Sequence, residues 1–442
     1  MWRHSRRRFL KGKANGVSSS LTQCKEIMKD NGVFCILPFV HLHINTHGNV
    51  KPCCLSPTIS ENVGKVSDST IEEIFNSDKM KQLRLDMING VSRPDFCKTC
   101  YKNEAAGFQT YRGALNGAFS DSVEPVLNSI QEDGYLEPKL KYLDTRYSNL
   151  CNLKCRTCGD KYSTSWSKEN ADNGKGIYKE LKAYTEKDPL DNQYVNVERV
   201  YFAGGEPLIM SEHYDTLRKI IETGRASEVE LAYNTNMTKL NYNKQYLPDL
   251  WKQFKSVHLG LSIDNVGERA NYIRHGNVKW NKIEQNIKTL RDYSNVDFVI
   301  SPTVSMMSAY TVTDMHRYLF ENNIIRDIDQ IRFNLLHEPG YYSVKILPDS
   351  IKKEIQAKIA DHITWIEDNN GSQETTNEFQ TLSDYLNNTW SKFEQMLWTT
   401  QLIKEITKID KIRNESFPDT FPEYREWWEE ITKNVIPTTN IQ

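Results

Sequence analysis

The chain has 442 residues, of which 38% are hydrophobic and 26% charged, and its formal net charge is -2. This composition is typical of a globular protein long enough for two or three domains. No run of about 18 apolar residues occurs, so we expect no membrane span. The near-neutral charge predicts no general attraction to nucleic acid. We therefore expect a cytoplasmic protein that neither enters a membrane nor binds nucleic acid.

The N-terminal residues 1–32 are basic. Ser5-Arg6-Arg7-Arg8-Phe9 is similar to the start of a twin-arginine export signal. The residues that follow lack the apolar stretch that such a signal needs. We predict a basic, flexible arm over 1–32.

All nine cysteines lie in the first half of the chain, and none follows Cys158. Clustered thiols in a large chain more often bind metal or do redox chemistry than form a disulfide framework. We predict that residues 33–107 form a small cysteine-rich α+β domain. Its expected elements are a strand over Val40–Asn45, a turn at Thr46–Asn49 and a short return strand ending at Cys53.

A helix is expected later in the same domain. Ser69-Thr70-Ile71-Glu72 predicts a capping box, after which apolar residues share one helical face as far as Gly90. The polar stretch 108–138 is predicted to be a linker.

Over residues 139–345, apolar strands alternate with amphipathic helices. Six βα units in this order predict an α/β fold with a parallel sheet curled into a partial (β/α)6 TIM-like barrel. The site of such a fold lies in the loops after the strands. Residues 346–442 predict a helical C-terminal extension. The expected strands are Leu140–Thr145, Glu198–Ala203, Glu228–Asn234, Ser256–Ile263, Asp297–Val304 and Gln330–Leu336.

The loop after the first of these strands carries three cysteines, Cys151, Cys155 and Cys158. Three thiolates so close together can ligate three irons of a [4Fe-4S] cluster and leave the fourth iron open to a substrate. Zinc is the alternative, although it prefers four ligands and no histidine lies nearby in the sequence.

The loop after the second strand reads Ala203-Gly204-Gly205-Glu206-Pro207. The two glycines let the backbone approach a ligand closely. The neighbouring carboxylate can pair with an ammonium group. This loop and the cysteine loop are expected on the same face of the barrel.

Together, these two loops resemble the radical S-adenosylmethionine (SAM) superfamily in motif and separation. The resemblance implies that a [4Fe-4S] cluster with one open iron binds SAM and cleaves it reductively. The 5′-deoxyadenosyl radical so formed takes a hydrogen atom from substrate. An electron donor such as flavodoxin or ferredoxin is implied.

The same resemblance implies which residues hold SAM. Gly204, Gly205, Glu206 and Pro207 form the loop that binds the amino group. Asn234 and Asn236 match polar cofactor contacts, Ser262 and Asp264 match ribose contacts, and Arg274 matches the carboxylate-binding arginine. Thr157 departs from the family, which usually has a bulky residue there, so the adenine contact is unassigned.

A second set of cysteines comprises Cys35, Cys53, Cys97 and Cys100. It resembles the twitch or SPASM auxiliary-cluster domain, which usually follows the barrel but here precedes it. The resemblance implies a second [4Fe-4S] cluster with four thiolate ligands. The thiol count favours one auxiliary cluster over two. A zinc ribbon uses the same spacings and stays open as an alternative.

We expect an enzyme acting on a small molecule or nucleotide, and its net reaction could be oxidation, epimerisation or bond formation. A peptide maturase is the alternative among enzymes. A zinc-binding, non-catalytic interaction protein is the alternative outside them. Cys54, spare in this count, is the candidate for a catalytic hydrogen-atom donor.

Overall fold

The computed structural model describes residues 32–57, 62–107, 109–185, 187–276 and 279–434. All of the predicted basic arm except Gly32 falls outside these ranges. The described chain divides into two compact units. The first takes its described residues from 1–148, 182–201 and 215–229, and the second from 149–181, 202–214 and 230–442.

The first unit is built around strand β1 (His41–Ile44), which has a partner on each side. On one side it pairs antiparallel with β2 (Asn49–Lys51), and β2 pairs antiparallel with β3 (Gly64–Lys65). On the other side it pairs parallel with β4 (Tyr142–Thr145). The hairpin predicted between Val40 and Cys53 is therefore confirmed.

Gly48 makes the hairpin turn with a φ of 75°, which L side chains rarely adopt. A Cβ at this position would also lie 2.4 Å from the carbonyl oxygen of Ala183. Both the backbone conformation and the close contact therefore require glycine here.

The helix predicted after the hairpin is two helices, α4 (Ile71–Phe75) and α5 (Asp78–Ile88). The capping box is one residue later than predicted: the Thr70 side chain accepts from the Glu73 N–H, and the Glu73 carboxylate accepts from the Thr70 N–H at 2.8 Å. The extended backbone of Ser77 separates the two helices. The first unit also contains α3 (Leu37–Val40), α6 (Pro94–Ala105), α7 (Tyr111–Ala118) and α8 (Ser120–Ser129).

Helices α7 and α8 fall within residues 108–138, where we predicted a linker. The next strand along the chain after β4 is β5 (Arg199–Phe202), and α10 (Ser211–Glu222) follows it.

The second unit contains the parallel strands β6 (Glu230–Thr235), β9 (Ser256–Leu261) and β10 (Val296–Ile300), in that order. The strand predicted over Asp297–Val304 is interrupted, because Pro302 has no N–H to donate to a ladder. The residues after it form β11 (Thr303–Val304), which pairs parallel with β12 (Asn334–Leu335). A hairpin of β7 (Asn241–Tyr242) and β8 (Gln245–Tyr246) was not predicted.

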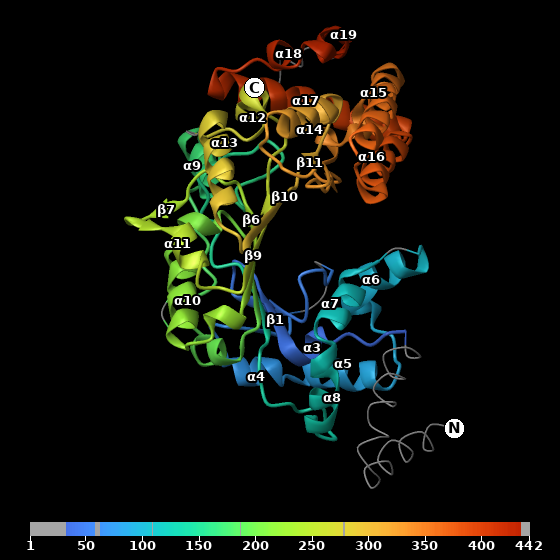
Figure 1. The fold of residues 1–442 in the computed structure, drawn as a ribbon. Helices are drawn as coiled ribbons and strands as arrows, with labels where there is room; N and C mark the ends of the chain where they lie inside the picture. The colour runs from blue at the N-terminus through green and yellow to red at the C-terminus, as the bar shows by residue number, and fades with distance from the viewer. Residues whose placement is uncertain (1–31, 58–61, 108, 186, 277–278, 435–442) are drawn as a thin grey trace, which may run out of the picture. The chain divides into compact units, whose positions relative to one another are not determined.

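Helices fill the gaps between these strands and form the C-terminal region (Figure 1). The prediction of an α/β fold with mainly parallel strands and a helical extension is confirmed. No helix in the described ranges is long and apolar enough to cross a bilayer. The helices are α9 (Thr164–Asp172), α11 (Leu247–Trp251), α12 (Gly267–Ile273), α13 (Trp280–Thr289), α14 (Val312–Glu321), α15 (Asp349–Asp368), α16 (Gln373–Leu386), α17 (Lys392–Arg413), α18 (Phe417–Thr420) and α19 (Arg425–Asn434).

Candidate active site

The three cysteines of the Cys151–Cys158 loop lie together in the second unit. Burial raises the pKa of the Cys155 thiol to about 11, and the neighbouring Cys158 raises it further while Arg274 lowers it. The pKa of Cys151 is likewise raised by burial and by the other two thiols. Cys158 disfavours ionisation of both Cys151 and Cys155, and Cys155 disfavours that of Cys151, so these thiols interact electrostatically.

Backbone hydrogen bonds fix this loop to the segment that follows α12. The Lys154 N–H donates to the His275 carbonyl at 2.7 Å, and the Arg156 N–H donates to the Ile273 carbonyl at 2.8 Å. These bonds place Arg274 beside the thiols, and its Nη1 lies 3.8 Å from Cys155 Sγ. A guanidinium here compensates the negative charge that thiolates and a bound cluster would bring.

Arg274 also pairs with Asp264, the residue matched to a ribose contact. Its Nε lies 2.8 Å from Asp264 Oδ2, and its Nη2 donates to Asp264 Oδ1 at 2.9 Å. Asp264 is buried, and its Oδ1 also accepts from the Thr303 N–H at 2.7 Å. The two predicted cofactor contacts thus form one bidentate ion pair, which orients the guanidinium towards the thiols.

The glycine loop lies directly against the backbone just before the cysteines. The Glu206 N–H donates to the Leu150 carbonyl at 2.7 Å. A Cβ at Gly205 would lie 2.1 Å from that same oxygen, so any side chain there would separate the two loops. The structure therefore brings the two predicted motifs into contact.

Glu206 is a buried carboxyl, only 2% exposed. It accepts from the Asn236 N–H at 2.7 Å, the Thr235 hydroxyl at 2.7 Å and the Leu208 N–H at 3.1 Å. Burial nevertheless dominates and raises the pKa of Glu206 to about 7. A buried carboxyl with such a pKa is suited to receive a cation.

The other predicted contacts lie on nearby segments of the second unit. The Asn236 side chain donates to Asn152 Oδ1 inside the cysteine loop at 3.1 Å. Ser262 is held by its N–H, which donates to the Thr235 carbonyl at 2.8 Å. Asn234 is exposed at the end of β6, and Pro207 is buried after Glu206.

The C-terminal region holds the cysteine loop through buried charges that we did not predict. Arg156, whose side chain is 0% exposed, lies 2.6 Å from Asp410 and 2.5 Å from Glu415. Its guanidinium also stacks 3.6 Å from the ring centre of Tyr272. No local sequence signal could reveal these pairs, since about 250 residues separate their members.

A second buried arginine supports the same loop. Arg413, at the end of α17, pairs with Glu169 at 2.9 Å and lies over the ring of Trp166. The Trp166 indole N–H donates to the Cys155 carbonyl at 2.7 Å. The last turn of α17 thus contacts the cysteine loop through α9.

The four cysteines of the auxiliary set line one small pocket in the first unit. Burial raises the pKa of Cys35 to about 12, and Cys97 and Cys100 raise it further. Arg112, which also lines the pocket, lowers it. The other lining residues are mostly apolar: Leu37, Leu55, Phe96, Thr99 and Tyr111.

In the described part of the chain, no group of three or more His, Cys, Asp or Glu residues forms a ready site for a metal ion. Two histidines of β1, His41 and His43, contact β4. His41 Nδ1 lies 3.0 Å from the Tyr142 carbonyl, and His43 Nδ1 lies 3.1 Å from Asp144.

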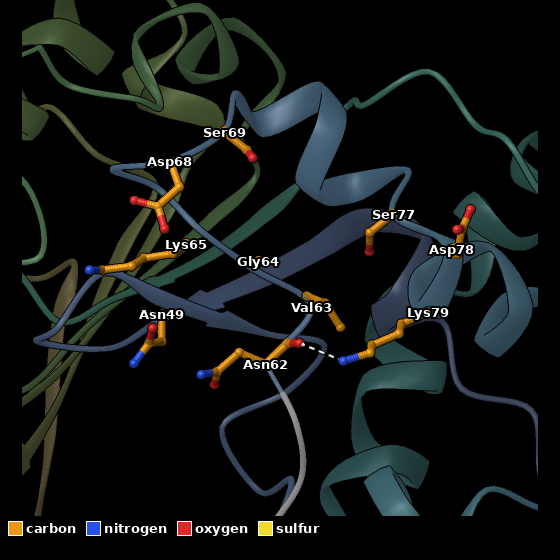
Figure 2. Close-up of a pocket in the computed structure, with 10 residues that line it drawn as sticks. All are labelled: Asn49, Asn62, Val63, Gly64, Lys65, Asp68, Ser69, Ser77, Asp78 and Lys79. Carbon is orange, nitrogen blue, oxygen red and sulfur yellow. Dashed lines mark hydrogen bonds between the residues drawn. The ribbon is translucent and has the colours of Figure 1, made fainter.

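A larger hollow in the first unit lies between the β2–β3 hairpin and the start of α5 (Figure 2). Its lining is mostly exposed, and Lys79 donates across it to the Asn62 carbonyl at 3.4 Å. None of the cysteines or predicted cofactor contacts lines it.

Sequence reasoning missed a polar group beside Cys54. The thiol of Cys54 interacts electrostatically with Tyr111, Tyr142, Arg146 and Tyr201. It does not line the pocket of the four auxiliary cysteines. The signal that could have revealed this group is an acidic residue, Asp144, directly after the apolar pair Tyr142 and Leu143 of the predicted strand.

Two family models match the chain over the regions just described. Residues 145–314 match the radical SAM superfamily, and residues 35–101 match SPASM, an iron-sulfur cluster-binding domain. The chain therefore contains a radical SAM domain, and a SPASM-type domain lies ahead of it in the sequence. The predicted resemblance and the unusual domain order are confirmed.

These families imply a [4Fe-4S] cluster and SAM for the first match and iron–sulfur ligation for the second. The residue types present fit these groups, although no three of the described donors are gathered around the position of a single metal ion. Three mutually interacting thiols lie beside a cation, a glycine contact that a Cβ would fill and a buried carboxyl. Four more thiols line a largely apolar pocket.

Several solved structures are similar to this chain at low identity and low TM-score. Native anSMEcpe with bound AdoMet is 20% identical over 52% of this chain and 62% of that chain, with a TM-score of 0.38. Streptococcus suis SuiB bound to S-adenosylmethionine is 13% identical over 74% and 69%, with a TM-score of 0.31. The chain spans less than two thirds of the anSMEcpe chain. No curated protein matches the sequence.

Proposed function

We propose that this protein is an enzyme that cleaves SAM reductively and abstracts a hydrogen atom from a small-molecule or nucleotide substrate. The observation that carries the proposal is the contact between the two loops, in which the Glu206 N–H bonds to the Leu150 carbonyl next to Cys151. A ligand that binds both an iron at the thiols and the carboxyl of Glu206 is the kind of molecule this contact accommodates.

In this proposal Cys151, Cys155 and Cys158 ligate three irons and leave one open. When bound there, the cluster supplies the electron that breaks a carbon–sulfur bond of SAM and yields the 5′-deoxyadenosyl radical. Glu206, supported by Asn236, holds the ammonium group of SAM. Arg274, oriented by Asp264, holds its carboxylate.

The remaining contacts complete the cofactor site. Gly204 and Gly205 allow close backbone approach, with a φ of 117° at Gly204. Asn234 and Ser262 offer polar groups at the ends of neighbouring strands, and Pro207 fixes the loop. Flavodoxin or ferredoxin is the proposed electron donor, and the cytoplasm the proposed compartment.

The auxiliary cysteines are proposed to hold a second [4Fe-4S] cluster through Cys35, Cys53, Cys97 and Cys100. Cys54, which lies outside their pocket but beside Tyr142 and Arg146, stays the proposed hydrogen-atom donor. A Cys54→Ala variant should still cleave SAM but fail to form product.

The test is anaerobic purification, iron analysis and a cleavage assay. We expect brown protein with about eight irons per chain, and 5′-deoxyadenosine on reduction with dithionite in the presence of SAM. Colourless, zinc-loaded protein that forms no 5′-deoxyadenosine would support the non-catalytic alternative.

A peptide substrate is the second candidate from the sequence. Two of the similar solved structures contain peptides, namely anSMEcpe with the Cp18Cys peptide and SuiB with the precursor peptide SuiA. Adding peptides encoded next to the gene and searching for a mass change would separate this candidate from the first.

A further inference from the structure

Polar side chains that the proposed SAM chemistry does not use lie near the carboxyl ends of β1, β4 and β5. His43 lies on β1, Asp144 and Arg146 lie on β4 and just after it, and Tyr201 lies on β5. His43 and Asp144 are directly paired in the parallel ladder, so their side chains share a face. We call these four residues the strand-end cluster.

Asp144 is the centre of the strand-end cluster and is 0% exposed. The Arg146 Nε donates to Asp144 Oδ1 at 2.9 Å, and Nη2 donates to Oδ2 at 3.4 Å. On the other side, His43 Nδ1 lies 3.1 Å from Oδ2. Although burial opposes ionisation, Arg146 and His43 hold the pKa of Asp144 well below its usual range.

A buried ion pair of this kind is weak evidence for stability, because desolvation of both charges offsets their attraction. Buried titratable groups that perturb one another are common at functional sites. The guanidinium of Arg146 also lies 5.3 Å from the ring centre of Tyr201, and burial raises the pKa of Tyr201 to about 12. Tyr201 therefore keeps its proton and can donate it in a hydrogen bond.

The pairing leaves polar atoms of the strand-end cluster unused. Arg146 Nη1, His43 Nε2 and the Tyr201 hydroxyl take no part in the contacts described above. Arg146 Nη1 and the Tyr201 hydroxyl are donors, and the only carboxylate of the cluster is already occupied. The chemical group that best matches a guanidinium edge with a neighbouring hydroxyl is an oxyanion.

The strand-end cluster is close in the sequence to members of both sets of cysteines. Four residues separate Arg146 from Cys151 in the sequence, which limits the distance between their Cα atoms to about 18 Å. Two residues separate Tyr201 from Gly204, which limits that Cα distance to about 11 Å. The strand that carries His43 runs into the hairpin that ends at Cys53.

We propose that the strand-end cluster is the substrate-anchoring site, in which Arg146, with Tyr201 and His43, binds a carboxylate or phosphate group of a small-molecule substrate. The inference rests on the proposed function, because it needs an enzyme that abstracts hydrogen. It adds the chemical class of the substrate and the residues that hold it.

The experiment uses deuterium to detect a substrate without knowing its identity. The probe is the small-molecule extract of cells grown in heavy water, in which carbon-bound hydrogen is largely deuterium. Reconstituted holoenzyme, SAM, dithionite and this extract should yield 5′-deoxyadenosine that is one mass unit heavier. Treating the extract with phosphatase distinguishes the two oxyanions: loss of labelling indicates a phosphate and persistence indicates a carboxylate, and either supports the proposal.

The first variant is Arg146→Gln, which removes the cation paired with buried Asp144. The second variant combines Arg146→Gln with Asp144→Asn, so that no unpaired carboxylate is left buried. Labelled 5′-deoxyadenosine should fall at least about tenfold in both, the loss expected for a charge-assisted hydrogen bond. Iron content and unlabelled 5′-deoxyadenosine formed without extract should not change. The matched control is Arg199→Gln on β5, whose guanidinium lies over Tyr142 and outside the strand-end cluster.

Equal labelling in the wild type and both Arg146 variants would overturn the inference. The inference is supported if the wild type forms deuterated 5′-deoxyadenosine with the complete extract but not with an extract depleted of anions. If the wild type with complete extract forms only unlabelled 5′-deoxyadenosine, the proposed oxyanion substrate is wrong. SAM cleavage itself would still be supported. Absence of any 5′-deoxyadenosine from the wild type would instead refute the proposed function.

Discussion

The two sets of cysteines in this protein differ in what surrounds them. Around Cys151, Cys155 and Cys158 lie charged and polar groups, including Arg274 and the buried carboxyl of Glu206. Around the auxiliary four the lining is mostly apolar, and Arg112 is the cation among the lining residues. The first set has three thiols with polar groups beside them. The second set has four thiols in a mostly apolar pocket.

This difference separates two kinds of thiol site. A cluster held by three thiolates keeps one iron for an exogenous ligand, so it needs groups that bind that ligand. A cluster held by four thiolates needs only placement and a low-dielectric pocket that tunes its potential. The following predictions test whether the two sites differ in this way.

Removing a thiol from each site gives the largest expected contrast. Cys155→Ala should abolish 5′-deoxyadenosine formation and lower the iron content by roughly four per chain. Cys97→Ala should lower the iron content similarly but retain cleavage of SAM. Iron analysis and chromatography of 5′-deoxyadenosine check both variants, and equal loss of cleavage would remove the distinction.

Substitution of Arg156 tests whether its ion pairs with the C-terminal region stabilise the Cys151–Cys158 loop. Arg156→Ala leaves Asp410 and Glu415 without their buried cation and should lower the free energy of unfolding by about 3–5 kcal/mol. Chemical denaturation of the holoprotein measures it.

The control is Arg332→Ala, because Arg332 pairs with an exposed partner, Glu374. Its expected loss is about 1 kcal/mol or less. Similar losses for the two variants would contradict the buried support.

The pH dependence of SAM binding tests the role of Glu206 beside Cys151, Cys155 and Cys158. Its pKa is raised to about 7, so its carboxyl loses its proton as the pH rises through that value. If the carboxylate binds the ammonium group of SAM, wild-type affinity should rise across pH 6 to 8. Glu206→Gln should bind about tenfold more weakly at pH 8 and lose this dependence. Equilibrium dialysis with SAM measures both, and a pH dependence retained in Glu206→Gln would exclude the role.

The same raised pKa affects the stability of the protein before SAM binds. A buried carboxyl of this kind contributes stability that is fully present below the unfolded pKa near 4.5 and is lost as pH rises through about 7. The change amounts to about 3 kcal/mol. Denaturation at pH 5 and pH 8 should show it in the wild type and not in Glu206→Gln.

Arg112 should have the smallest effect, confined to the auxiliary site. Its positive charge lowers the pKa of Cys35 and Cys97 and stabilises added negative charge. Arg112→Gln should lower the reduction potential of the auxiliary cluster by tens of millivolts and leave SAM cleavage unchanged. Spectroscopic redox titration checks this, and an unchanged potential would show that Arg112 does not tune the cluster.

The sequence alone predicted the family, the order of its domains and the α/β fold. Motifs such as Cys151–Cys158 and Gly204–Pro207 are local, because a loop can present closely spaced ligands only if they are close in the chain. The alternation of apolar strands and amphipathic helices is equally local, so most strands were predicted to within a few residues. The capping box was predicted one residue too early, because Ser69 and Thr70 are each followed three residues later by a glutamate.

Only the tertiary structure revealed the contacts that join distant segments. Arg156 meets Asp410 and Glu415, and Arg413 meets Glu169, across more than 240 residues of chain. His43 and Asp144 meet because β1, which lies outside the predicted barrel, pairs parallel with its first strand. The sequence therefore determined which residues could bind iron and SAM, because spacing encodes those sites. The folded chain decided which buried charges meet, because ion pairs depend on position in space and leave no periodic pattern in the sequence.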